Sequence, residues 1–133
     1  MIHPTVATLR LFLHVLAATI WVGGQLTLAG LVPTARTISP GAPRTLAHRF
    51  AQLAWPAYGV LILTGIWNIT AVHPVWDSTY GTTLIIKLAV VALSGIAAWA
   101  HSASSTPRAI AVWGAISGLS AVLALLLGVM LHG

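Results

Sequence analysis

Four long apolar runs dominate this sequence and leave little choice of fold. They cover approximately residues 9–32, 50–72, 81–100 and 109–131, and each has about the 20 residues that a helix needs to cross a bilayer core. Lipid offers the backbone no hydrogen-bond partners, so such segments must be helical. The short connections favour neighbouring helices that run in opposite directions. We therefore predict an all-α integral membrane protein, with residues 1–133 forming one transmembrane domain, an up-down four-helix bundle.

The composition supports a lipid environment and excludes several functions. Charged residues make up 5% of the chain, whereas a typical soluble domain has about 25%. Six basic residues against one acidic residue are too few for the basic face that binds nucleic acid, so we expect no nucleic-acid partner. The absence of cysteine excludes disulfides, thiolate metal sites and thiol nucleophiles. The expected surroundings are the lipid bilayer of the cell (plasma) membrane.

The basic residues predict the orientation of the helices. Most of them lie in the first and third connections, as Arg36, Arg44, Arg49 and Arg108. The opposite side carries Arg10 and the acidic Asp77. Because basic connections stay on the cytoplasmic side, both termini are expected outside. The first apolar run is longer and more polar than the plain 7–15 residues of a signal peptide, so we expect it to be a membrane helix.

Polar residues inside the spans gather on one face of each helix. On the first helix they are Arg10, His14, Trp21 and Gln25. Their separations of 4, 7 and 4 positions place them in a narrow stripe of a helix with 100° per residue. Lipid rejects polar side chains, so this face should turn towards the other helices. From the rise per residue, His14, Asn68 and Lys87 are predicted in one layer, roughly 9–10 Å below the outer surface.

Each of these residues also has a simpler interpretation. Lys87 lies close enough to the outer interface to extend its ammonium group to water. His14 is able to serve as a hydrogen-bonding residue between helices. Trp21 is suited to packing between helices and not only to lining a cofactor site.

The available ligands limit the metal chemistry. The one carboxylate side chain lies in a connection, which argues against a paired-carboxylate mechanism, and imidazole is the strong metal ligand of this chain. Imidazole suits haem iron, copper(II) or zinc. Copper(I) prefers sulfur, but the methionines are Met1 and Met130, so a path lined by methionine is not expected.

A b-type haem fits these ligands best. Haem is flat and apolar, and a four-helix bundle is able to hold it between facing helices. His14 is the candidate for the first axial ligand, and His73 and His132 are candidates for the second. The haem propionates need cations near the outer interface, where Arg10 and Lys87 are expected. Asn68 and Trp21 complete the predicted cofactor-binding set.

Three segments resemble the copper-resistance-D (CopD)-like membrane proteins. Residues 13–24 (LHVLAATIWVGG) resemble the signature of their first helix. Residues 49–54 (RFAQLA), followed by 63–65 (LTG), resemble the next motif, and residues 80–88 (YGTTLIIKL) resemble their Tyr-Gly-x-x-Leu-x-x-Lys helix start. The segments have the family's order and spacing across the first three helices. The resemblance implies a role around copper, in transport or resistance.

The His-to-Trp spacing of the first helix and the lysine of the third are also similar to the HemJ type of protoporphyrinogen oxidase. Members of that family are small helical membrane proteins that bind b-type haem. Carried over, this resemblance implies His14 as a haem ligand and Lys87 as a further important residue.

These observations favour a membrane haem protein of the CopD-like group. We expect a redox or electron-transfer role that is linked to copper handling and uses a redox partner of unknown identity. If the protein is an enzyme, it would be a membrane oxidoreductase. The first alternative is copper transport or resistance without haem, using histidine ligands. The second is a cofactor-free scaffold subunit. A homodimer is a further expectation, because a neighbouring copy is able to supply missing ligands.

Overall fold

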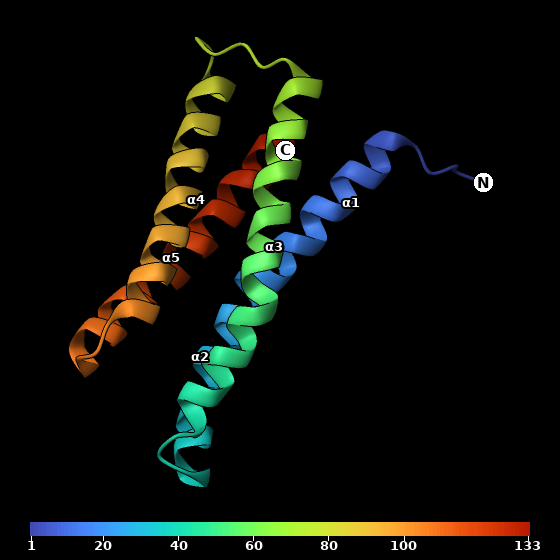
Figure 1. Cartoon of the computed structure of the whole chain (residues 1–133). Helices are drawn as coiled ribbons and strands as arrows, with labels where there is room; N and C mark the ends of the chain where they lie inside the picture. The colour runs from blue at the N-terminus through green and yellow to red at the C-terminus, as the bar shows by residue number, and fades with distance from the viewer. The chain divides into compact units, whose positions relative to one another are not determined.

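The computed structural model describes residues 1–133, and helices form almost all of it. Four helical segments are long and apolar enough to cross a membrane: Val6–Ile38, Ala42–Val72, Thr79–Ala103 and Pro107–His132 (Figure 1). The predicted all-α class and the four predicted spans are thereby confirmed. Contacts divide the chain into two compact units, Met1–His73 and Pro74–Gly133, and each is described by itself.

Each helical span extends beyond the apolar run that predicted it, and polar side chains cap the starts of three of the four. Thr5 begins the first span with a capping box, in which its hydroxyl accepts from the Thr8 amide at 3.1 Å. Ser78 and Thr106 cap the third and fourth spans in the same way, at 3.1 and 3.2 Å. These side chains satisfy amide groups that a helix start leaves without partners. The helices therefore reach past the apolar core into the polar interface.

The first span is not a uniform α-helix. It consists of α1 (Val6–Ala18), a π-helical segment η1 (Thr19–Gly23) and α2 (Gly24–Ile38). Figure 1 shows that α2 runs alongside α3 (Ala42–Val72), whereas the N-terminal end of α1 leans away from it. A π-helical segment adds backbone to one turn and so redirects the helix that follows. This change of direction divides the first span into α2, which runs along α3, and α1, which contacts α3 but leaves it at its N-terminal end.

Small residues form the contact between the first span and α3. The buried apolar residues of α3 at this contact include Ala54, Ala57 and Leu61, and Ala17 is buried on α1. Gly24 packs against the Phe50 ring so closely that a methyl group there would lie 2.3 Å from a ring carbon. Between helices in lipid, close approach gains dispersion energy that water exclusion does not supply.

The second unit is a helical hairpin of α4 (Thr79–Ala103) and α5 (Pro107–His132). Ser94 and Ser117 join the two helices reciprocally: each hydroxyl donates to the backbone carbonyl of the other residue, both at 2.9 Å. Both serines are buried, as are the small Ala97 and Ala121. The two hydrogen bonds and the small side chains hold the backbones of α4 and α5 close together along their middle turns.

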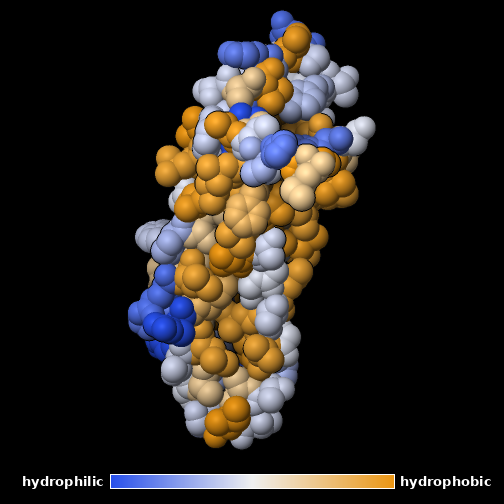
Figure 2. Space-filling model, turned by 90° about the vertical axis from the view of Figure 1, so that its right-hand side faces the viewer, coloured by the Kyte–Doolittle hydropathy of each residue, from blue (hydrophilic) through white to orange (hydrophobic).

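The surfaces of the helices are suited to lipid. Large apolar side chains are exposed along all four spans, and Figure 2 shows a face covered mostly by hydrophobic residues, with hydrophilic ones towards its ends. In water such a surface would be far larger than the apolar patches that soluble monomers tolerate. The exposed side chains thus agree with a multi-pass membrane protein.

Candidate functional site

Two polar contacts connect α1 to α3 in the first unit. Arg10 donates from Nε to Oδ1 of Asn68 at 2.6 Å, and one helical turn further along α1, Nδ1 of His14 lies 2.8 Å from Oγ1 of Thr64. The spacing of four residues on each helix puts both contacts on the facing sides of an antiparallel pair. Three of the four residues are partly buried, and Thr64 is fully buried. The predicted polar face of the first helix is therefore turned towards α3.

The bonds of Thr64 determine where the His14 proton lies. The Thr64 hydroxyl has one proton and donates it to its own helix, to the carbonyl of Val60 at 2.7 Å or Leu61 at 3.2 Å. When this proton is donated to Val60, the Thr64 oxygen acts as an acceptor towards Nδ1 of His14. Neutral His14 consequently carries its proton on Nδ1, and the lone pair is on Nε2. This is the tautomer in which a histidine binds metal through Nε2.

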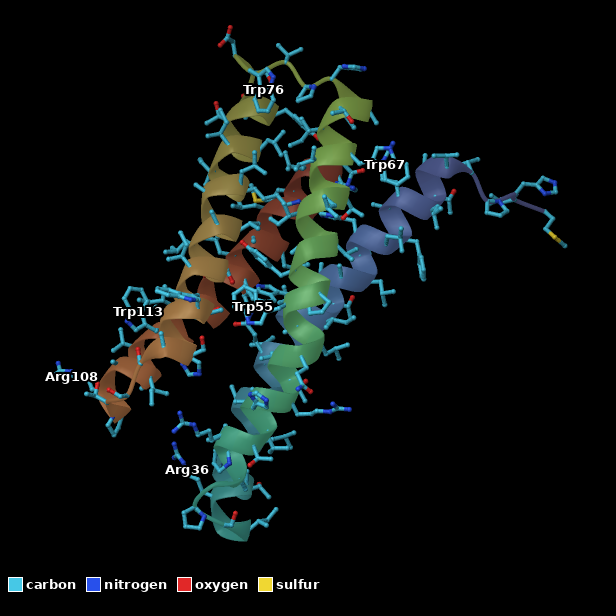
Figure 3. The ribbon with its side chains drawn as sticks, viewed as in Figure 1. Arg36, Trp55, Trp67, Trp76, Arg108 and Trp113 are labelled. Atoms are coloured by element: carbon cyan, nitrogen blue, oxygen red, sulfur yellow. The ribbon has the colours of Figure 1, made fainter.

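An aromatic cluster follows this polar segment along the first span. Trp21, in η1, is buried and its ring centroid lies 4.5 Å from that of Tyr58 and 5.4 Å from that of Trp55. Figure 3 labels Trp55 on α3. Both partners are on α3, one turn apart, so Trp21 closes the contact between helices directly below the polar contacts. Trp21 packs against these side chains in the way that its simpler interpretation predicts.

Lys87 lies against α5 within the second unit. A methyl group built on Gly128 would be 3.2 Å from the Lys87 Nζ and 3.5 Å from its Cε. The missing side chain of Gly128 therefore leaves the room in which the end of Lys87 lies. The side chain crosses to the neighbouring helix, and its ammonium end is at the level of Gly128.

Within the first unit, the structure separates His73 from His14. His73 is the exposed C-terminal cap of α3, nine residues beyond Thr64, which corresponds to about 13 Å of helix. His132 ends α5 in the second unit and is exposed. The structure brings no three His, Cys, Asp or Glu side chains together as a metal site.

The axial register differs from the predicted layer of His14, Asn68 and Lys87. Within the first unit His14 pairs with Thr64, and Asn68 lies one turn nearer the helix end, where it binds Arg10. The prediction placed residues by counting from the ends of apolar runs, but α1 begins at Val6, three residues before its run, whereas α3 ends at Val72 as its run does. The earlier start of α1 places His14 about one turn further along α3 than the count predicted.

Several residues of this site were not selected from the sequence. Thr64 has no motif that would select it, because its contact with His14 depends on the register of the two helices. Trp67 contributes its ring face to Arg10, whose guanidinium carbon is 5.9 Å from the ring centroid. Gly128 has no motif that would pair it with Lys87. Glycine on a transmembrane helix indicates close packing in general. It does not indicate that the group packed against Gly128 is the end of a lysine side chain.

Comparison with known proteins gives one family and one curated relative. The family described as copper resistance protein D matches residues 44–132. The copper transport protein CutJ of Bacillus subtilis (strain 168) is 34% identical over 93 residues, which cover 64% of this chain and 17% of CutJ. The chain thus spans about a sixth of the length of that relative. No solved structure matches. The resemblance to the HemJ type finds no support in these matches.

Proposed function

Because the chain belongs to the copper resistance protein D family, we propose that it carries copper within the membrane and that His14 binds the ion as cargo. The observation that carries this proposal is the hydrogen bond between His14 and Thr64. It holds the imidazole between two helices of a membrane span in the tautomer whose Nε2 coordinates metal. The curated relative, a copper transport protein, supports copper as the metal.

The chemistry of imidazole fits a transported ion. Imidazole binds copper without the tight grip of several thiolates, and this chain has no cysteine. An ion that passes through a membrane must bind well enough to enter each site and weakly enough to leave it. Histidines placed in succession meet both conditions. We propose His73 and His132 as further ligands, reached before or after His14, because crossing four times puts both on the same side of the membrane as the N-terminus.

Haem b is the second candidate, and one observation favours it. A haem-ligating histidine also uses one ring nitrogen for iron and donates from the other to a protein oxygen, as His14 does to Thr64. Arg10 and Lys87 remain the candidates for its propionates, and an electron-transfer role would follow. Copper transport is preferred because family and relative both concern copper.

The test uses purified protein in liposomes that contain a fluorescent copper chelator. Wild type is expected to admit copper, and His14→Ala is expected to slow uptake at least about tenfold, the effect of losing a principal interaction of 1.4 kcal/mol or more. His48→Ala is the matched control, because His48 is exposed at the other end of the same unit. Uptake by His14→Ala at the wild-type rate would exclude His14 from the path.

An absorption spectrum of the same samples, oxidised and then reduced, separates the two candidates. Colourless protein that admits copper supports transport without haem. A Soret band with sharp bands after reduction, lost in His14→Ala, supports haem and would replace the copper proposal.

A further inference from the structure

The guanidinium of Arg10 is held by two neutral side chains of α3. Asn68 accepts from Nε at 2.6 Å, and the Trp67 ring lies below the group, 5.9 Å from the guanidinium carbon to the ring centroid. Figure 3 labels Trp67 on α3. An amide oxygen fixes the direction of the fork, and an aromatic face fixes its plane. The group is therefore oriented before any ligand arrives.

The charge of this held group is not neutralised by its partners. Asn68 and Trp67 carry no charge, and the bond to Asn68 uses Nε, whereas the structure assigns no hydrogen bond to either Nη atom of Arg10. The whole chain has one acidic side chain, Asp77, against six basic ones, and Asp77 lies in the second unit. A partly buried arginine normally has an anionic partner. The first unit, Met1–His73, contains no Asp or Glu, so an anionic partner of Arg10 must come from outside this unit.

The depth of Arg10 indicates the chemistry of the anion. It lies four residues after the first residue of α1, which is about 6 Å along the helix. A side chain of this length reaches the headgroup region from there. Two parallel N–H groups of a guanidinium fork match the oxygens of a phosphate group.

We propose that Arg10, held by Asn68 and Trp67, is a binding site for a phosphate group at the N-terminal end of α1. The phosphate comes either from a phospholipid headgroup or from free phosphate in solution. The site lies one turn from His14 but does not depend on copper, so it goes beyond the proposed transport.

The test compares two titrations of the detergent-purified protein. Native mass spectrometry measures binding of phosphatidylglycerol, and calorimetry measures binding of inorganic phosphate. Arg10→Gln is expected to weaken the relevant binding about tenfold or more, the usual effect of losing a charge-assisted pair. Asn68→Ala keeps the charge but releases Nε, and is expected to weaken binding by a smaller factor. Arg36→Gln, which removes an exposed arginine at the end of α2, is the matched control.

Each outcome has a definite meaning. Loss of lipid binding in Arg10→Gln, without binding of inorganic phosphate to wild type, identifies the lipid as the source. Binding of inorganic phosphate that Arg10→Gln abolishes identifies the soluble anion. Equal binding by wild type and Arg10→Gln, or an equal loss in Arg36→Gln, overturns the proposal. Gel filtration verifies the fold of each variant. If Arg10→Gln aggregates, Asn68→Ala decides, and wild-type binding by it excludes the oriented fork.

Discussion

At the scale of single residues, replacing Thr64 tests whether its contact with His14 matters for copper binding. Thr64→Val keeps the shape of the side chain but removes the oxygen that accepts from Nδ1 of His14. The imidazole then loses its fixed tautomer and orientation, and copper affinity is expected to fall about 10- to 100-fold, as for other partners of metal ligands. Competition with a chelator of known affinity measures this. Thr64→Ser retains the hydroxyl and should bind almost as wild type does; equal affinity of the valine variant would contradict the role.

A second prediction at this scale concerns the position of the Lys87 side chain beside Gly128. Gly128→Leu fills the room beside the Lys87 Nζ, which now lies 3.2 Å from the position of a methyl group. The flexible lysine should move out of this seat, and a water-soluble acylating reagent should modify it several times faster. Peptide mass spectrometry of the labelled protein measures the rate. Gly118→Leu is the control, because Gly118 lies on the same helix with open space around the added group. In this variant Lys87 should be labelled at the wild-type rate.

At the scale of helices, the serine pair tests how α4 and α5 are held together. Ser94→Ala and Ser117→Ala each remove one interhelical hydrogen bond of 2.9 Å. Each is expected to lower the free energy of unfolding by about 0.6 kcal/mol, with an upper value near 1.7, as measured for such bonds in membranes. Reversible unfolding in mixed detergent micelles measures the loss. Ser102→Ala is the control, because it removes a hydrogen bond inside α4, to the carbonyl of Trp99. An equally large loss of unfolding free energy in this variant would show that the interhelical serine bonds are not responsible.

Helices were also the part of the fold that the sequence predicted best. Apolar length identifies each span, and the period of polar residues identifies which face of α1 meets α3, since these depend on one helix at a time. The pairing of His14 with Thr64 instead of Asn68 depends on the sliding of one helix along another, which no single-helix pattern determines. Nor does any residue type signal the π-helical segment η1. Lys87 was predicted as polar and inward, but its place beside Gly128 follows from the contact of two helices.

At the scale of the whole molecule, the orientation in the membrane remains a prediction with a direct test. The chain has no cysteine, so a single introduced cysteine reports one position. An impermeant maleimide applied to intact cells should label Asp77→Cys, whereas Ser39→Cys and Ser105→Cys should react after permeabilisation. All three positions are exposed. The reverse pattern would place the termini inside, and labelling of all three in intact cells would contradict four crossings.

The boundary at His73 also bears on how the protein is made. Both partners of each polar contact, Arg10 with Asn68 and His14 with Thr64, belong to the first unit, Met1–His73. Their hydrogen bonds are therefore complete once this part of the chain has left the ribosome, before α4 is synthesised. Polar groups are costly in lipid while they have no partner. A nascent first hairpin already contains the partners for its most polar side chains, so the membrane insertion machinery is able to release it as a finished pair and then receive the second.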